Sequence, residues 1–277
     1  MSAYFERLTQ AIQTNRSHLC LGLDLRPEEM PEGVWRDTDG FVHFGRSIVE
    51  ATADLICAYK PNLAFYEAMG GGGYHTLRKI LEAIPPSIPA IADGKRADIG
   101  STARAYALAV FDRLGFDAVT LNPYLGHDAL EPFFEHADCG CYVLCLTSNP
   151  GAADFQVPND LYLEVARRAS EWNKNGNIGL VVGATQSERI ADVRRAAPDL
   201  PFLIPGVGAQ GGDLEASVRA AANDRPDRGF IINVSRSVLY ASSGNDYAAA
   251  ARREAERLRA EIEEVLSRID PQGGVVE

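Results

Sequence analysis

The sequence predicts one α/β domain, a (β/α)8 barrel over residues 1–277 with a helix preceding the first strand. A length of 277 residues and a hydrophobic content of 46% allow a large core and lie near the size of such a barrel, about 250 residues. Short β-branched or apolar runs alternate with longer stretches of helical period, which is typical of repeated βα units. Eight successive units without a hairpin signal favour a closed barrel over an open sheet, because closure removes both edge strands.

The expected strands are the short runs richest in apolar and β-branched residues: 18–24, 58–65, 88–95, 118–122, 140–148, 178–185, 201–208 and 229–235. Between them, stretches such as 101–115 and 161–173 have the amphipathic period of helices. Residues 3–14 are predicted to form a helix that closes the bottom of the barrel, and residues 246–268 the last helix. The tail at 271–277 is expected to fray.

Two stretches interrupt the regular pattern. The four glycines at 70–73 favour a flexible connection over a phosphate-binding loop, because the Lys-Ser or Lys-Thr ending of a P-loop is missing. The segment 149–160 follows the fifth strand at the end of the barrel where catalytic loops lie. Both a mobile lid and an inert loop fit this segment.

Charge and cysteine content limit the classes of partner and compartment. Twenty-seven basic and 38 acidic residues give a net charge of −11, which disfavours nucleic acid or an anionic membrane as the main partner. No secretory pattern opens the sequence and no apolar run approaches about 18 residues, so a cytoplasmic location is expected. Cys139, Cys141 and Cys145 lack a second pair at zinc-site spacing, so the five cysteines are expected to be free and mostly buried.

Polar residues lie at the strand ends, where barrels of this class carry their reacting groups. The residues that an ordinary strand end would not need are Asp24, Lys60, Asp93, Lys95, Ser148, Gln210 and Arg236. Ser148 alone is a weak signal, because Ser and Thr before Asn-Pro-Gly also form turns. The five histidines are scattered, and none lies beside a nucleophile as a triad would require.

The segment DGKRAD at 93–98 ends the third strand. Strand alternation places Asp93 and Lys95 on one face, so a carboxylate and an ammonium project together into the barrel mouth. Gly94 and Arg96 are predicted to point the other way. Asp98 follows three residues after Lys95 and would complete an Asp, Lys, Asp array. Three charges at this spacing can arise by chance, so the segment gains its weight from its place at a strand end.

The ends of the seventh and eighth strands resemble a phosphate site. PGVGAQGGD at 205–213 is rich in glycine, and VSRS at 234–237 precedes a helix. Barrels of this class bind phosphate here with backbone N–H groups and one cation, so Arg236 would supply the charge and Gln210 a neutral donor. Turn glycines with a surface arginine are the alternative. Asp24 would either cap a helix or accept hydrogen bonds from sugar hydroxyls.

These segments together resemble the orotidine 5′-phosphate decarboxylase family, in particular its longer bacterial branch. The resemblance covers nearly the whole chain in the right order, through LGLD at 21–24, YKPNLAFYE at 59–67, DGKRADIGST at 93–102, LTSNPG at 146–151, PGVGAQGGD at 205–213 and NVSRS at 233–237. It implies the conversion of orotidine 5′-monophosphate to uridine 5′-monophosphate and carbon dioxide, in pyrimidine biosynthesis, with no cofactor and no metal.

The resemblance also implies a role for each site residue. Lys95 would protonate C6 as the carboxylate leaves, with Asp93 close to that carboxylate and Lys60 ordering the charges. The chemistry fits these residue types, because loss of carbon dioxide leaves a carbanion that the ring delocalises poorly and that a fixed cation can stabilise. Asp93 would also raise the energy of the bound substrate relative to the transition state.

Other residues are implied to bind substrate or to act across a subunit boundary. The implied roles are ribose binding by Asp24, pyrimidine binding by Ser148, phosphate binding by Gln210 and Arg236, and contact with the neighbouring active site by Asp98, Ile99 and Thr102. The family therefore implies a homodimer with shared sites. Because QGGD is predicted to lead directly into a helix, the segment 149–160 would do more of the closing over the phosphate.

Three alternatives differ in chemistry. A Mg²⁺-dependent keto-sugar-phosphate decarboxylase would need a metal-binding carboxylate at the end of the second strand, where the sequence has Lys60 and the nearest acid is Glu67. A Schiff-base aldolase using Lys95 is weakened by the flanking carboxylates, which keep the lysine protonated. A non-catalytic nucleotide-binding barrel predicts missing charged residues, and none is missing.

Overall fold

A computed structural model describes residues 2–207 and 211–269 and has eight parallel strands in one sheet. The strands are β1 Leu19–Leu21, β2 Ala58–Tyr59, β3 Ile91–Arg96, β4 Ala118–Leu121, β5 Gly140–Leu146, β6 Ile178–Val182, β7 Phe202–Pro205 and β8 Phe230–Val234. Their order is β2-β1-β8-β7-β6-β5-β4-β3, and the parallel bridges Tyr59–Ala90 and Asn62–Asp93 join the two outer strands. The predicted (β/α)8 TIM barrel is confirmed.

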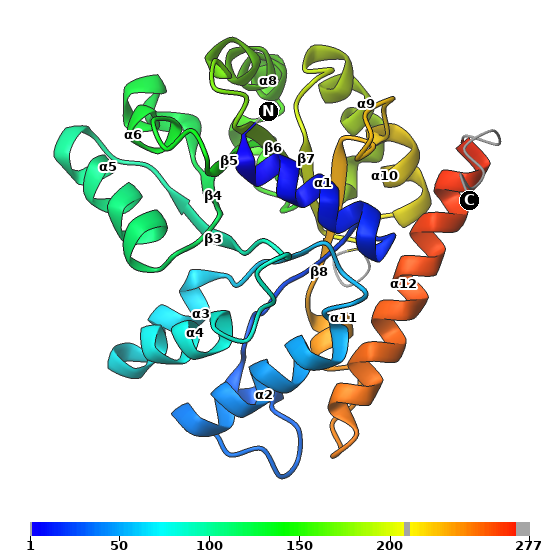
Figure 1. Cartoon of the computed structure of the whole chain (residues 1–277). Coiled ribbons are helices and arrows are strands. Elements are labelled where there is room, and N and C mark those ends of the chain that lie inside the picture. Colours follow the sequence, from blue (N-terminus) through cyan, green and yellow to red (C-terminus); the bar gives the residue numbers. More distant parts are fainter. Residues whose placement is uncertain (1, 208–210, 270–277) are drawn as a thin grey trace.

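Helices surround the strands (Figure 1). The α-helices are α1 Ala3–Asn15, α2 Thr38–Thr52, α3 Leu63–Glu67, α4 Gly73–Leu81, α5 Gly100–Ala107, α6 Glu131–Phe134, α7 Ala152–Phe155, α8 Leu161–Trp172, α9 Ser187–Ala196, α10 Leu214–Ala221, α11 Arg236–Leu239 and α12 Tyr247–Ile269. Short 3₁₀ turns cover Pro27–Glu29, Gly70–Gly72, Pro123–Leu125, His127–Ala129, Pro158–Asp160 and Ala184–Gln186, and a π-helical stretch covers Leu108–Arg113. None of these helices is both long and apolar enough to cross a lipid bilayer.

Helix α1 closes the bottom of the barrel, as predicted, and lies across the end of the barrel that faces the viewer in Figure 1. Its apolar face, formed by Tyr4, Phe5 and Leu8, is buried. These side chains pack on inward-facing residues of the strands: Cys20, Ala58, Ile91, Ala118, Tyr142, Val181, Leu203 and Ile231. Burial of this apolar surface holds the helix against all eight strands.

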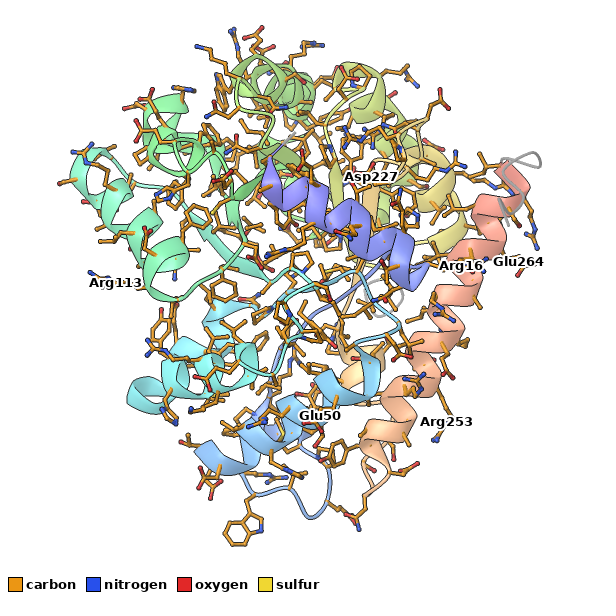
Figure 2. All side chains as sticks on the ribbon, in the orientation of Figure 1. Arg16, Glu50, Arg113, Asp227, Arg253 and Glu264 are labelled. Carbon is orange, nitrogen blue, oxygen red and sulfur yellow. The ribbon has the colours of Figure 1, made fainter. Side chains whose placement is uncertain are left out.

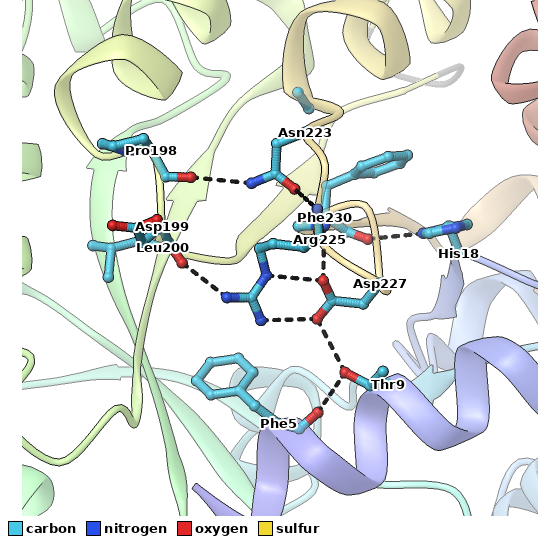
Figure 3. A network of polar contacts seen from close by, with 12 residues as sticks. Phe5, Thr9, His18, Pro198, Asp199, Leu200, Asn223, Arg225, Asp227 and Phe230 are labelled. Carbon is cyan, nitrogen blue, oxygen red and sulfur yellow. Dashed lines mark hydrogen bonds and ion pairs between the residues drawn. The ribbon is translucent and has the colours of Figure 1, made fainter. Parts of the chain in front are cut away.

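A polar network fastens α1 to the segment before β8 (Figure 3). The buried carboxylate of Asp227 accepts hydrogen bonds from Arg225 Nε at 2.9 Å, Thr9 Oγ1 at 3.1 Å and the Gly229 amide at 3.0 Å. Because a buried carboxylate is stable only when its oxygens are paired, this network fixes the position of α1.

The last helix, α12, packs along the outside of the barrel. Ala251, Leu258 and Ile262 lie on its buried face, whereas Arg253 and Glu264 are exposed on the other (Figure 2). The helix is thus amphipathic, as its predicted range of 246–268 requires. The predicted fraying of 271–277 concerns a segment outside the described residues.

The second strand is much shorter than predicted. The sequence predicted a strand over 58–65, but β2 ends at Tyr59 and α3 begins at Leu63. Pro61 has no N–H to donate to a sheet, and the Asn62 side chain accepts a hydrogen bond from Ala64 N at 3.1 Å, as a helix N-cap does. Lys60 therefore follows the end of β2 instead of lying near its start.

The glycine run at 70–73 is folded into helical turns and is not an irregular connection. Gly70–Gly72 forms a 3₁₀ turn, and Gly73 begins α4. A Cβ at Gly73 would lie 1.7 Å from the carbonyl oxygen of Tyr66, so only glycine fits where α3 meets α4. The segment 149–160 contains α7 and one 3₁₀ turn.

Candidate active site

A cavity of about 530 Å³ opens at the carboxyl ends of the strands. Its wall contains the predicted strand-end residues that the structure describes: Asp24, Lys60, Asp93, Lys95, Ser148 and Arg236. Gln210, the remaining predicted residue, lies outside the described part of the chain. The fold therefore brings together, at the strand ends, predicted side chains that are separated by more than 200 positions in the sequence.

Asp93 lies between two lysines. Its Oδ2 accepts a hydrogen bond from Lys60 Nζ at 2.7 Å, and its Oδ1 accepts one from Lys95 Nζ at 2.6 Å. Thr120 Oγ1 also donates to Oδ1, at 3.0 Å. The carboxylate therefore has three donors, two of them charged, and this is the arrangement that a buried anion requires.

The neighbouring charges in this group outweigh the effect of burial on Asp93 and Lys60. Burial disfavours the charged form of Asp93, but the ammonium groups of Lys60 and Lys95 outweigh it and hold the pKa of Asp93 well below its usual range. Burial acts against the charge of Lys60 too, and the carboxylates of Asp93 and Asp24 reverse this effect and raise its pKa. Lys60 is only 4% exposed, whereas the Lys95 side chain is 47% exposed and faces the cavity.

Asp93 and Lys95 meet because β3 bulges, and not because the strand alternates regularly. The register between β3 and β4 passes from Ala92–Val119 directly to Arg96–Leu121, and Lys95 has a positive φ of 46°. Regular alternation, the predicted cause, is therefore wrong, although the predicted meeting of the side chains is observed. A bulge re-aims side chains in this way beside many active sites.

Arg96 points away from the Asp93 group. Its guanidinium forms an ion pair with Glu67 at the end of α3 and lies 5.3 Å from the ring centroid of Tyr106 on α5. The prediction that the residues between the charged ones face away from the cavity is consistent with this position. Arg96 thus ties the bulged strand to its neighbouring helices.

Asp24 joins the end of β1 to the start of α3. Its Oδ1 accepts a hydrogen bond from the Asn62 amide at 3.2 Å, and its side chain lines the cavity. The alternative role, a cap for the helix that follows, is not observed, because the 3₁₀ turn at Pro27–Glu29 has Arg26 at its N-cap and no side-chain cap. The carboxylate therefore borders the ligand space instead of capping that turn.

The far side of the cavity has the composition of a phosphate site. Arg236 begins α11 directly after β8, and Gly206 and Ser235 lie on the same wall. The backbone at Gly212 lies against the backbone at Gly206, where the Gly212 amide donates a hydrogen bond to the Gly206 carbonyl oxygen at 3.0 Å. One cation near exposed backbone groups is the combination that binds phosphate in barrels.

The segment after β5 forms part of the cavity wall through Ser148, Asn149 and Gln156. The Gln156 side chain accepts a hydrogen bond from Thr147 N at 2.7 Å and donates one to Thr147 Oγ1 at 2.8 Å. This double contact folds α7 back over the strand end. The segment therefore borders the cavity, whether or not it moves.

Asp98, Ile99 and Thr102 are not among the residues of this cavity wall. They lie around the start of α5: Asp98 and Ile99 precede the helix, and Asp98 Oδ1 accepts a hydrogen bond from the Ile99 amide at 2.8 Å. Ile99 is 64% exposed and Thr102 is exposed as well. These three residues therefore lie outside the pocket of their own chain.

A family model for orotidine 5′-phosphate decarboxylases, described as the "Orotidine 5'-phosphate decarboxylase / HUMPS family", matches residues 17–253. The chain belongs to this decarboxylase family. A protein of Roseiflexus castenholzii named orotidine 5′-phosphate decarboxylase is 54% identical over 269 residues, which cover 95% of this chain and 98% of the relative. One of the same name from Thermomicrobium roseum is 50% identical over 279 residues, covering 98% and 99%.

Solved structures of the decarboxylase family have the same fold. The Leishmania donovani OMP decarboxylase superposes with a TM-score of 0.83 at 39% identity, over 96% of this chain and 99% of that chain. A putative orotidine 5′-phosphate decarboxylase from Streptomyces avermitilis gives a TM-score of 0.80 at 32% identity, over 96% and 97%. The family predicted from the sequence is therefore confirmed.

Thr120 and Asn62 are among the polar residues of this decarboxylase cavity that sequence reasoning missed. Thr120 is a single hydroxyl within the apolar run of β4, and Asn62 caps α3 while its amide contacts Asp24. A lone polar residue inside a buried strand was the available signal for Thr120. Asn62 could have been found from the Lys-Pro-Asn sequence, which is typical of a strand end followed by a helix cap.

Proposed function

We propose that this chain decarboxylates orotidine 5′-monophosphate to uridine 5′-monophosphate and carbon dioxide, the last step of pyrimidine synthesis, without a cofactor. Membership of the decarboxylase family supports this reaction. The observation that carries it is the Asp93 carboxylate held between Lys60 and Lys95 at the cavity wall. That group places an anion and an ammonium side by side at the cavity wall.

Lys95 is the proton donor to C6 in this proposal. Its Nζ is hydrogen-bonded to Asp93 Oδ1 at 2.6 Å, and its half-exposed side chain can reach a ligand in the cavity. As the C6 carboxylate leaves, negative charge develops on the ring carbon, and a positioned ammonium both stabilises that charge and transfers a proton to it. The product then retains a C6–H bond.

In this proposal the Asp93 carboxylate repels the substrate carboxylate that leaves as carbon dioxide. Because Lys60 and Lys95 keep Asp93 ionised, a substrate carboxylate placed beside it meets a like charge that disappears in the transition state. Leu144, Val181 and Leu203 lie on the same cavity wall and provide an apolar surface that strengthens these electrostatic effects.

The remaining polar residues bind the unreactive part of the nucleotide. Asp24 holds the ribose hydroxyls, Ser148 contacts the pyrimidine edge, and Arg236 with Gln210 binds the phosphate. The placement of Asp24, Ser148 and Arg236 on one cavity wall supports these roles. Binding energy from the phosphate then offsets the repulsion at the carboxylate.

We further propose that the enzyme is a homodimer in which Asp98, Ile99 and Thr102 complete the partner's site. Exposed apolar side chains support an interface. Ile99 is 64% exposed, Tyr124 is 79% exposed and Phe155 is 66% exposed, and the rings of Tyr124 and Phe155 lie 6.5 Å apart. Grouped apolar side chains of this size are typical of protein contact sites.

The expected compartment is the cytoplasm, and nucleic acid is not an expected partner. All five cysteines are free, which fits a reducing compartment. The net charge of −11 opposes binding to a polyanion.

The reaction is tested by following loss of the orotate chromophore in the presence of EDTA. Wild-type protein is expected to turn over the substrate, and Lys95→Ala to lose about 10²- to 10⁴-fold in kcat because its proton donor is gone. Lys79→Ala, which removes an exposed lysine paired with Glu82 on α4, is the control and keeps full activity. Absence of wild-type turnover under EDTA contradicts the proposal, and turnover restored by Mg²⁺ would show that the decarboxylation needs a metal ion.

A further inference from the structure

Thr120 lies on β4, next to β3, and contacts Asp93; its side chain is buried, with 2% of the residue exposed. We propose that Thr120 is a positioning residue for decarboxylation: its hydroxyl fixes the Asp93 carboxylate and the Lys95 backbone in one geometry. This inference rests on the proposed function, because it assigns Thr120 a part in the same reaction.

One hydroxyl group makes both contacts. Thr120 Oγ1 donates to Asp93 Oδ1 at 3.0 Å and accepts a hydrogen bond from the Lys95 amide at 2.9 Å. An ionised carboxylate only accepts and a backbone N–H only donates, so the direction of both bonds is fixed. The hydroxyl is therefore locked in one rotamer, with its single proton on the carboxylate.

The backbone explains why a hydroxyl is needed at this position. Between the register pairs Ala92–Val119 and Arg96–Leu121, residues 93–95 of β3 lie opposite Thr120 alone. Lys95 has a φ of 46°, a conformation that costs energy for a residue with a Cβ and persists only when its surroundings hold it. The Thr120 hydroxyl accepts a hydrogen bond from the Lys95 amide and so stabilises this backbone conformation.

The same contact determines where the proton donor lies. Asp93 Oδ1 accepts hydrogen bonds from the Thr120 hydroxyl and from Lys95 Nζ, whereas Oδ2 accepts one from Lys60 Nζ. Without the hydroxyl, the carboxylate has one fewer donor to fix its plane, and the Lys95 backbone loses its partner. The Lys95 ammonium then samples positions away from C6, which lowers the rate of proton transfer more than it lowers nucleotide affinity.

The test compares Thr120→Val, which keeps the shape and removes the hydroxyl, with Thr120→Ser, which keeps the hydroxyl. For Thr120→Val we expect kcat to fall about 10- to 100-fold, the scale of a lost hydrogen bond to a charged group, with uridine 5′-monophosphate affinity within about threefold of wild type. Thr120→Ser is expected to recover most of the activity. Thr76→Val is the matched control, because Thr76 on α4 is also buried and its hydroxyl has no hydrogen-bond partner among the described residues.

Three results would overturn the inference: unchanged kcat in Thr120→Val, an equal loss in Thr120→Ser, or a parallel loss of kcat and product affinity. Thr120→Ala supplies a second variant without the hydroxyl, and failure of both variants to fold would make Thr120 a folding residue and also refute the positioning role. These outcomes differ from failure of the proposed function. In that case the wild-type protein itself does not decarboxylate the substrate.

Discussion

Lys60 and Asp93 form a buried pair whose charges depend on each other. Lys60 Nζ lies 2.7 Å from Asp93 Oδ2, and both side chains are largely excluded from water. Such a pair contributes little net stability compared with apolar residues, but loss of one partner leaves a buried charge without compensation. In the proposed reaction the pair holds charge in place, and removal of one partner exposes the energetic cost of the buried charge.

Replacement of Lys60 by alanine is expected to reduce both activity and stability. Asp93 keeps only Lys95 as a charged donor, so the free energy of unfolding should fall by about 3–5 kcal/mol. Urea unfolding at a fixed protein concentration measures the change, and Lys79→Ala should show little effect because Lys79 is an exposed residue. Equal unfolding midpoints for Lys60→Ala and wild type would contradict the expected role of the pair.

His18 links stability to pH. Its ring is buried and stacks on Phe230 at 4.7 Å, and Nδ1 lies 3.1 Å from the Phe230 carbonyl oxygen. Because this oxygen only accepts, Nδ1 carries the proton in the neutral ring. Burial lowers the pKa of His18, although the Phe230 carbonyl and the charge of Asp227 oppose the shift.

Acid is therefore expected to destabilise the protein through His18. Below about pH 6.5 the unfolded chain binds a proton at this position and the folded chain does not. The contribution is fully present above pH 6.5 and is lost as the pH falls, by up to about 1.4 kcal/mol per pH unit. Urea unfolding between pH 7 and pH 5 should show a shallower decline in His18→Gln than in wild type, whereas His75→Gln on the exposed side of α4 should decline like wild type. The same slope in all three proteins would exclude His18 as the source.

The residue types of the site could be predicted from strand ends, and their exact contacts could not. Asp93 and Lys95 were found because a carboxylate and an ammonium are rare at the end of a buried strand. The role of Thr120 depends on the bulge in β3, which brings three residues opposite one. A bulge leaves no reliable signal in a sequence that already contains Gly94, so its effect becomes visible only in the structure.

Helix α9 is held at its C-terminal end by a buried arginine. The guanidinium of Arg194 donates to the carbonyl oxygens of Ala221 at 2.9 Å, Leu200 at 2.7 Å and Gly229 at 2.8 Å. It also lies 3.6 Å from the ring centroid of Phe202. Burial lowers the pKa of Arg194 to about 10, so it remains charged at neutral pH. One side chain thus joins α9, α10 and the turns that lead into β7 and β8.

Replacement of Arg194 by lysine should destabilise this part of the barrel. A lysine keeps the charge but cannot donate in three directions from a planar group, so some carbonyls lose their donors. We expect a loss of about 2–3 kcal/mol in the free energy of unfolding, from two or three hydrogen bonds at about 1 kcal/mol each. Urea unfolding measures it, and the adjacent exposed Arg195→Lys serves as the control. A stability equal to that of the control would contradict this role.

The order and type of the elements were predictable, but some boundaries were not. Each predicted strand overlaps an observed one, because buried parallel strands have continuous apolar runs with clear ends. The second run, 58–65, is apolar on both sides of residues 60–62, where the strand gives way to α3. Apolarity alone does not separate a short strand from the buried face of a short helix, and the proline and asparagine between them decide the boundary.

For the whole molecule, the family could be predicted because its motifs lie in order along nearly the entire chain. That order carries more information than any one segment. The association of two chains could not be predicted from residue patterns alone. Asp98 lies outside the cavity of its own chain, and the sequence contains no signal for the distance between Asp98 and a second copy of the chain. The contribution of Asp98 to a shared site therefore remains a proposal.

Mixed dimers test this proposal directly. Lys95→Ala and Asp98→Ala proteins are each expected to be inactive, because each site lacks one required group. After subunit exchange, a heterodimer contains one site with both wild-type residues, so activity should return to about a quarter of the wild-type value by random mixing of equal amounts. Exchange is verified with differently tagged subunits. If the heterodimers form and no activity returns, Asp98 does not act in the partner's site.

The position of α1 determines when the barrel can be completed during synthesis on the ribosome. Its apolar face packs on Leu203 and Ile231, and β1 pairs with β8, so the first two elements to leave the ribosome find their partners in the last strands. Until residues near 234 have emerged, the earliest helix lacks part of its packing surface and β1 can pair only with β2. The nascent chain is therefore expected to stay incompletely folded through most of its translation and to close in one late step.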